Sequence, residues 1–156
     1  MKRVYSILFF SLIFFNCMAQ SPMQKSNLVQ GPDVAVQFIN DYVAFCSQQA
    51  DSENNWIAEN KLLTDNFKAS YIKLIESAFK EDPELGLGFD PILDAQDYPD
   101  QGFKLLRYDH DTGFVTLEGK DWADFILVLK VVKQKGKWLV DGAGVINIPE
   151  NKRGKR

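Results

Sequence analysis

The chain changes character at one segment, Phe89-Asp90-Pro91-Ile92-Leu93-Asp94-Ala95-Gln96-Asp97-Tyr98. Before this segment, apolar residues recur every three or four positions, which is the period of helices that pack on a core. After it, short runs rich in β-branched and aromatic residues alternate with turn residues, as in antiparallel strands. Because Pro91 and Pro99 enclose residues 92–98, we expect that stretch to be extended. Helices followed by strands predict an α+β fold.

Three helices are predicted before this segment. Asp33 is a suitable N-cap for the first, which should cover residues 33–49. A polar break then leads to a short helix over residues 56–61. Thr64 gives a second N-cap signal, and the long helix that it opens should end before Pro83, because proline disfavours helical geometry at the preceding residue.

The second half of the chain predicts a meander of four strands. We expect them at residues 103–108, 114–118, 125–132 and 138–148. Gly113 suits a positive φ in the first hairpin loop. Gly142 and Gly144 lie inside the last strand and indicate a bulge or a strong bend. A bend there would curl the sheet around the helices and leave a concave face.

The strand expected at residues 125–132 is apolar on both faces. One face should contact the helices. The other face would need a second layer, a second subunit or a bound ligand to cover it. This pattern leaves a ligand site and a homodimer interface open as alternatives.

The N-terminus has the features of a secretory signal at residues 1–19. Lys2 and Arg3 precede an apolar run at residues 7–15, and Ala19 suits the position before a cleavage site. The run is too short to span a bilayer, and no other apolar stretch reaches spanning length. We therefore expect an exported protein, periplasmic or extracellular. The alternative is a lipid anchor at Cys17.

Composition limits the domain count and the partners. With 156 residues, 46% of them hydrophobic, the chain has enough apolar side chains for a single core, which we place at residues 33–149 after a flexible lead-in at 20–32.

The formal net charge is −3, and residues 150–156 form a basic tail that we expect to be disordered. An otherwise acidic body argues against nucleic acid as a partner, since phosphate binding needs a basic surface.

Several parts of the sequence together resemble a known fold and family. The two long helices, followed by a meander ending in Gly136-Lys137-Trp138-Leu139-Val140-Asp141, resemble the nuclear transport factor two-like, or cystatin-like, cone fold. Residues 90–98 resemble the hallmark of a family of small secreted bacterial proteins of unknown function. The resemblance covers about residues 33–148 and implies N-terminal helices packed in a strongly curved antiparallel meander sheet, with an envelope location. It implies no established activity, so no catalytic residue is carried over.

The carboxylates of the dividing segment are the first candidates for chemistry. In the cone fold, an inward carboxylate can act as a general base when an apolar cavity raises its pKa. Asp94 and Asp97 are the candidates, with Gln96 and Tyr98 as hydrogen-bonding neighbours. The competing interpretation is that these carboxylates stabilise a turn or face solvent.

Other constellations point to binding rather than to catalysis. The aromatic and amide side chains that could line a pocket are Tyr42, Tyr71, Gln96, Tyr98 and Trp122. The Asp109-His110-Asp111 loop lacks the spaced oxygen ligands of a calcium site and the nitrogen or sulfur ligands of a zinc site, so we read it as a solvated turn. We find no nucleophile motif and no phosphate loop, and we expect neither a metal nor a cofactor.

These observations favour a non-enzymatic exported domain. We expect it to bind a small apolar ligand or an envelope protein through the concave face of the sheet. Two alternatives stay open: a cone-fold enzyme that uses an Asp general base, and an inhibitor or immunity-type interaction protein.

Overall fold

The computed structural model describes residues 30–48 and 53–154. The predicted signal sequence at 1–19, the lipidation candidate Cys17 and most of the lead-in at 20–32 lie outside the described residues. Within the described ranges, no helix is both long enough and apolar enough to cross a bilayer.

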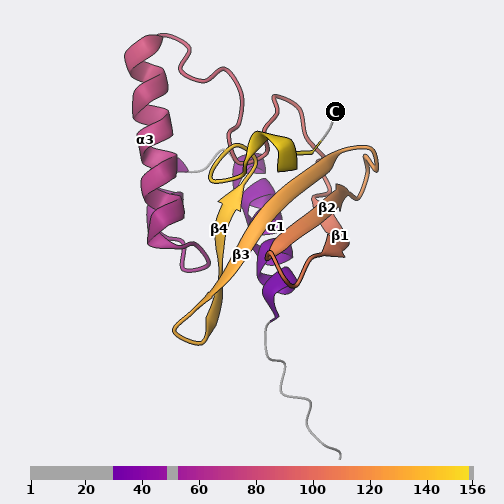
Figure 1. The fold of residues 1–156 in the computed structure, drawn as a ribbon. Helices are drawn as coiled ribbons and strands as arrows, with labels where there is room; N and C mark the ends of the chain where they lie inside the picture. The colour runs from indigo at the N-terminus through magenta and orange to yellow at the C-terminus, as the bar shows by residue number, and fades with distance from the viewer. Residues whose placement is uncertain (1–29, 49–52, 155–156) are drawn as a thin grey trace, which may run out of the picture.

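Three helices precede four strands in the described part of the chain, which confirms the α+β class (Figure 1). The elements are α1 (Gly31–Ser47), α2 (Glu53–Glu59), α3 (Asp65–Glu81), β1 (Phe103–Tyr108), β2 (Phe114–Gly119), β3 (Ile126–Gln134), β4 (Lys137–Ala143) and the short 3-10 helix η1 (Glu150–Lys152). The strands form one antiparallel meander in the order β1-β2-β3-β4.

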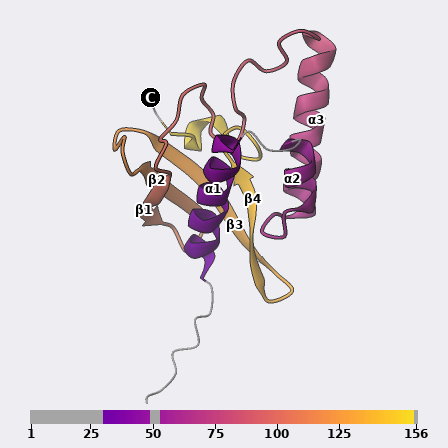
Figure 2. The same ribbon diagram turned by 180° about the vertical axis from the view of Figure 1, so that it is seen from behind.

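The core lies between α1 and one face of the sheet, which we call the inner face (Figure 2). Phe38 and Tyr42 of α1 are both buried, and their rings pack on each other and on Trp56 of α2. β2 and β3 contribute the buried residues Leu117 and Leu129 to the inner face. Along each strand these residues alternate with residues on the opposite, outer face. Each such buried side chain contributes about 1.5–3 kcal/mol through the hydrophobic effect. The inner face is therefore occupied by a helix of the same chain.

α3 begins at the predicted cap and lies beside β4. The Thr64 side chain accepts a hydrogen bond from the Phe67 N–H at 3.0 Å and donates one to Asp141 at 2.6 Å. Phe67 and Tyr71, in the first half of the helix, are buried, whereas Phe79 in the second half is 52% exposed. The second half thus stands away from the sheet, as Figures 1 and 2 show.

The dividing segment is a turn, so the prediction of an extended stretch at residues 92–98 is wrong. The backbones of Asp90 and Ala95 exchange two hydrogen bonds, at 2.8 and 3.3 Å, and Asp94 has a φ of 55°. The Asp90 carboxylate accepts hydrogen bonds from the N–H groups of Ile92 and Leu93, at 2.8 and 2.9 Å. Aspartate side chains form such turns with the backbone just after them, and here that preference prevails over the extended geometry that the prolines favour.

The sheet is not strongly curled, and in this respect the prediction of a strongly curved cone is wrong. Its irregularities are local. β3 pairs with β4 in a register that shifts between Lys130 and Val131, where Asp141 is the extra residue on β4, so the bulge predicted from Gly142 is confirmed. A second shift, at Leu106 in β1, was not predicted. Two local bulges in a four-stranded sheet bend single strands without rolling the sheet around the helices.

The first part of the C-terminal tail, residues 150–154, contains a short 3-10 helix. η1 follows Pro149, and Arg153 donates hydrogen bonds to the carbonyl oxygens of Ile148 and Val145, at 3.1 and 3.5 Å. The segment lies over the outer face of the sheet, opposite α1 (Figures 1 and 2). Residues 155–156 lie outside the described part of the chain.

Candidate functional site

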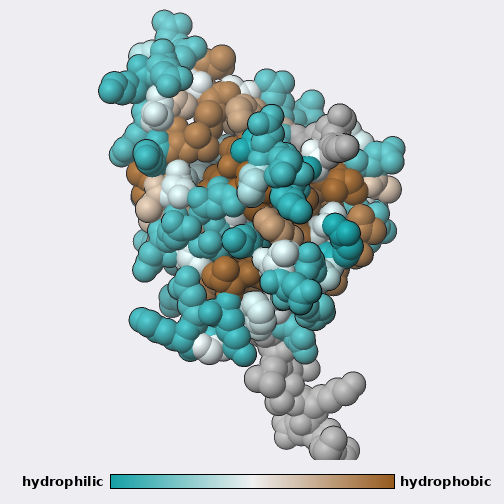
Figure 3. Space-filling model, in the orientation of Figure 1, coloured by the Kyte–Doolittle hydropathy of each residue, from teal (hydrophilic) through white to brown (hydrophobic). Residues whose placement is uncertain are grey.

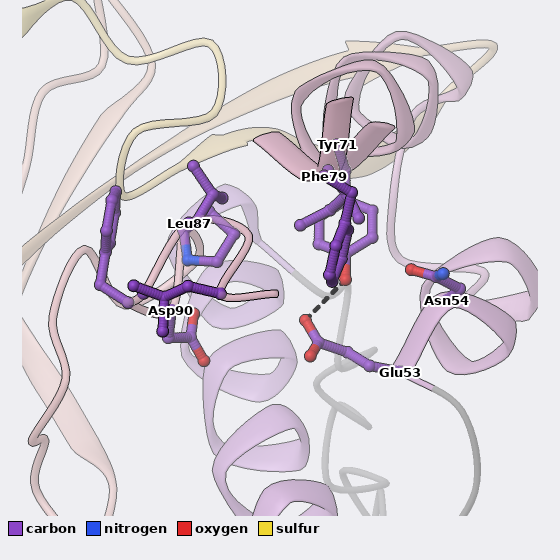
Figure 4. Close-up of a pocket in the computed structure, with 11 residues that line it drawn as sticks. Glu53, Asn54, Tyr71, Phe79, Leu87 and Asp90 are labelled. Carbon is purple, nitrogen blue, oxygen red and sulfur yellow. Dashed lines mark hydrogen bonds between the residues drawn. The ribbon is translucent and has the colours of Figure 1, made fainter. Parts of the chain in front are cut away.

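A groove of about 500 Å³ lies between α2, α3 and the segment that leads into the Asp90 turn (Figure 4). Apolar side chains form most of its walls. The lining residues are Glu53, Asn54, Tyr71, Ile75, Phe79, Leu85, Leu87, Gly88, Phe89, Asp90 and Pro91. Hydrophobic residues also gather on the upper surface between α3 and the sheet (Figure 3). The groove therefore combines apolar walls with two carboxyl groups.

Two tyrosines and these two carboxyl groups form a hydrogen-bonded cluster at the bottom of the groove. The Tyr42 hydroxyl lies 2.8 Å from Glu53 Oε1 and 2.7 Å from Asp90 Oδ2. The Tyr71 hydroxyl donates to the same Glu53 oxygen at 2.8 Å (Figure 4). The cluster joins α1, α2, α3 and the Asp90 turn, and we call it the carboxyl–tyrosine cluster.

One of the two carboxyl groups in this cluster must carry a proton if all three contacts are to be hydrogen bonds. Three short oxygen–oxygen contacts link its four side chains, but the two hydroxyl groups of Tyr42 and Tyr71 supply only two protons. A third proton on Asp90 would let that carboxyl donate to Tyr42, while Tyr42 and Tyr71 both donate to Glu53. Every contact would then be a hydrogen bond.

The surroundings shift the pKa of each of these groups in a consistent direction. Burial raises the pKa of the Asp90 carboxyl above its usual value, although the Leu93 N–H and the Tyr42 hydroxyl oppose the shift. Burial also raises the pKa of the Tyr42 hydroxyl, and the neighbouring carboxyl groups of Asp90 and Glu53 raise it further. The pKa of Tyr71 is raised by burial and by its hydrogen bond to Glu53. Both phenols therefore stay protonated and act as donors.

Of the predicted ligand-binding residues, the structure brings two to this site. Tyr71 lines the groove, and Tyr42 lies behind it with its side chain fully buried. Tyr98 is half-buried, and burial raises its pKa to about 12. Gln96 is exposed and donates to the Gly88 carbonyl oxygen at 2.8 Å, while Trp122 packs on Phe125, with 5.3 Å between the ring centroids. None of these last three residues lines the groove.

Neither predicted base candidate lines the groove. Asp97 is exposed and Asp94 is half-buried in the turn. The carboxyl group with the raised pKa is that of Asp90, from the same segment. Sequence reasoning missed Glu53 altogether, because it lies in the polar break before the short helix and only the folded chain brings it to Tyr42 and Tyr71.

Comparisons with protein-family models, with curated proteins and with solved structures gave no match to this chain. The resemblance to the secreted family and to the cone fold therefore stays a prediction. Among the described residues, no group of three or more His, Cys, Asp or Glu side chains is placed to hold a metal ion.

The raised pKa of Asp90 predicts a specific pH dependence of stability. The folded state binds this proton more tightly than the unfolded state, so the free energy of unfolding falls as the pH rises from the unfolded carboxyl value of about 3.9 to the raised folded value. Asp90→Asn cannot ionise and should lose this part of the dependence. Urea unfolding of both proteins across that pH range measures the difference. A difference that does not change with pH would contradict a neutral Asp90.

Proposed function

We propose that this protein binds small amphipathic molecules that have an apolar body and a cationic amine head, and that it holds them in the groove between α2, α3 and the Asp90 turn. The observation that carries the proposal is the composition of the groove: among the residues that the structure describes, its lining combines apolar side chains with Glu53 and Asp90 and includes no basic residue. Ligand sites commonly pair apolar walls with a few convergent polar groups that fix the orientation.

The charge of the site favours an amine over a carboxylate. An incoming carboxylate would meet the negative charge of Glu53 in a partly desolvated place, where like charges repel more strongly than in water. An ammonium group would instead form a charge-assisted hydrogen bond with Glu53. The Asn54 amide also lines the groove and is exposed, so it can accept a second hydrogen bond from the head group.

The groove replaces the concave sheet face as the place of binding in our proposal. The inner face of the sheet is covered by α1. The groove, in contrast, keeps exposed apolar walls: Leu85 is 68% exposed and Phe89 is 37% exposed. An envelope protein that presents a lysine beside an apolar side chain would satisfy the same chemistry.

A general-base role for Asp90 is the second candidate, favoured by its raised pKa at the edge of a groove. Both oxygens of Asp90 already have partners, because Oδ1 accepts from the Ile92 and Leu93 N–H groups and Oδ2 contacts Tyr42. A base needs a free oxygen directed at its substrate. We therefore place binding before catalysis.

Two equally exposed apolar side chains test where the ligand binds. Phe79 lines the groove and Leu106 lies in the β1 bulge, and each is 52% exposed. We expect Phe79→Ala to weaken binding of octylamine about five- to tenfold, a loss of about 1–1.4 kcal/mol of apolar contact. Leu106→Ala is the matched control and should leave the affinity unchanged. Isothermal titration calorimetry of the three proteins gives the comparison, and equal losses in both variants would place the ligand elsewhere.

A further inference from the structure

A second cluster of charges lies on the outer face of the sheet, on the side opposite α1. The β1 bulge at Leu106 creates part of it. Without the extra residue, Arg107 would pair with Val115 and point to the inner face; with it, Arg107 pairs with Thr116 and shares the outer face. Thr116 in turn pairs with Val128 on β3, and the next row joins Phe114 with Lys130.

The C-terminal segment completes this cluster. Lys152 and Arg153 line the same cavity of about 220 Å³ as Arg107, Phe114 and Thr116. The hydrogen bonds from Arg153 to two carbonyl oxygens fix the segment, and Gly154 lies so close to the Ile126 carbonyl that a Cβ atom there would collide with it. The cavity is thus built by β1, β2 and β3 together with the C-terminal segment.

Three basic side chains line this cavity, Arg107, Lys152 and Arg153, against one carboxylate, Asp109. The Lys130 and Lys152 ammonium groups lie 5.8 and 5.9 Å from the centre of the same Phe114 ring. Within the described part of the chain, the one ion pair within 4.0 Å is Lys104 with Glu118, which occupies a separate row of the sheet. Asp109 Oδ1 accepts hydrogen bonds from the turn N–H groups of Asp111 and Thr112. Hydrogen bonds from Thr112 lower the pKa of the Asp109 carboxyl, and the positive charge of Arg107 lowers it further, so this one carboxylate offsets only part of the charge.

We infer that this cavity binds a doubly charged oxyanion of the phosphate or sulfate type. Arg107, Lys152 and Arg153 outnumber the single carboxylate of the lining, and Lys130 adds a further positive charge over the Phe114 ring. An anion would offset this local excess of positive charge, which stands out in a protein that is acidic as a whole. Arginine and lysine both recognise such oxyanions through charge-assisted hydrogen bonds, and the Thr116 hydroxyl adds a neutral donor. This site is independent of the groove and of its proposed ligand.

The test is an NMR titration of the full chain with sodium phosphate, sodium sulfate and, as the screening control, sodium chloride at equal ionic strength. We expect saturable shifts of the Phe114, Thr116 and Ile126 amide signals with phosphate or sulfate. The double variant Arg107→Gln with Lys152→Gln should bind at least tenfold more weakly. The control double variant, Lys80→Gln with Lys135→Gln, makes the same charge change at exposed positions outside the cavity and should bind like the unchanged protein.

Two results would overturn this inference. The first is a set of amide shifts that grows linearly with salt and is the same for chloride as for phosphate and sulfate. The second is an equal loss of affinity in both double variants, which would mean that the anion responds only to the net charge of the protein. All four substitutions replace exposed side chains, which typically changes stability by no more than about 0.5 kcal/mol.

Discussion

Gly144→Ala should destabilise the protein by about 3–4 kcal/mol, which is a large effect for the addition of one methyl group. Gly144 has a φ of 57°, where a residue with a side chain costs roughly 1–2 kcal/mol. A Cβ atom there would also collide with the Pro91 carbonyl oxygen and lie 2.5 Å from that of Ile92. These are backbone atoms of the Asp90 turn, and the Pro91 carbonyl already accepts a hydrogen bond from the Val145 N–H at 2.9 Å. The substitution therefore pushes the turn away from the end of β4.

Gly136→Ala is the matched control for this prediction. Gly136 also has a positive φ, of 82°, but nothing lies within 4 Å of a Cβ atom built on it. Gly136→Ala should therefore lower the free energy of unfolding only by the cost of placing a side chain at a positive φ, about 1–2 kcal/mol. Urea unfolding of the two variants gives the comparison. Equal losses would show that the contact between the turn and β4 is not tight.

Asp90→Ala should cost about 2–4 kcal/mol, because it removes the partner of three groups at once. The Ile92 and Leu93 N–H groups would lose their acceptor, and the buried Tyr42 hydroxyl would keep only Glu53. Asp97→Ala is the control: it removes an exposed carboxylate from the same segment and should change stability by no more than about 0.5 kcal/mol. The measurement is the free energy of unfolding of each variant. Similar values for both would show that the carboxyl–tyrosine cluster contributes little to stability.

Local signals in the sequence predicted much of the fold. Thr64 marks the start of α3 because its side chain caps a backbone N–H only three residues away. The bulge in β4 was likewise predictable from Gly142, and the positive φ in the first hairpin from Gly113. In each case the physical cause lies within a few residues, so a single sequence contains it.

The candidate site depended on contacts that the sequence does not display. Glu53 and Asp90 are far apart in the chain, and both meet Tyr42 only because α1, α2 and the turn pack together. The turn itself was mistaken for an extended stretch because flanking prolines and an aspartate that bonds its own backbone give opposite signals. The curvature of the sheet was overestimated for a similar reason: glycines within strands indicate where a strand can bend, but not by how much.

The central claim is that the groove selects an amine head on an apolar body, and one pair of ligands tests it most directly. Octylamine and octanoate have similar apolar chains and opposite head-group charges, so an NMR titration with each separates charge from apolar contact. We predict that octylamine binds at least tenfold more tightly than octanoate, shifts the amide signals of Glu53, Tyr71 and Phe79, and loses this preference in Glu53→Gln. Equal or tighter binding of octanoate, or octylamine shifts that leave these three residues unchanged, would contradict it.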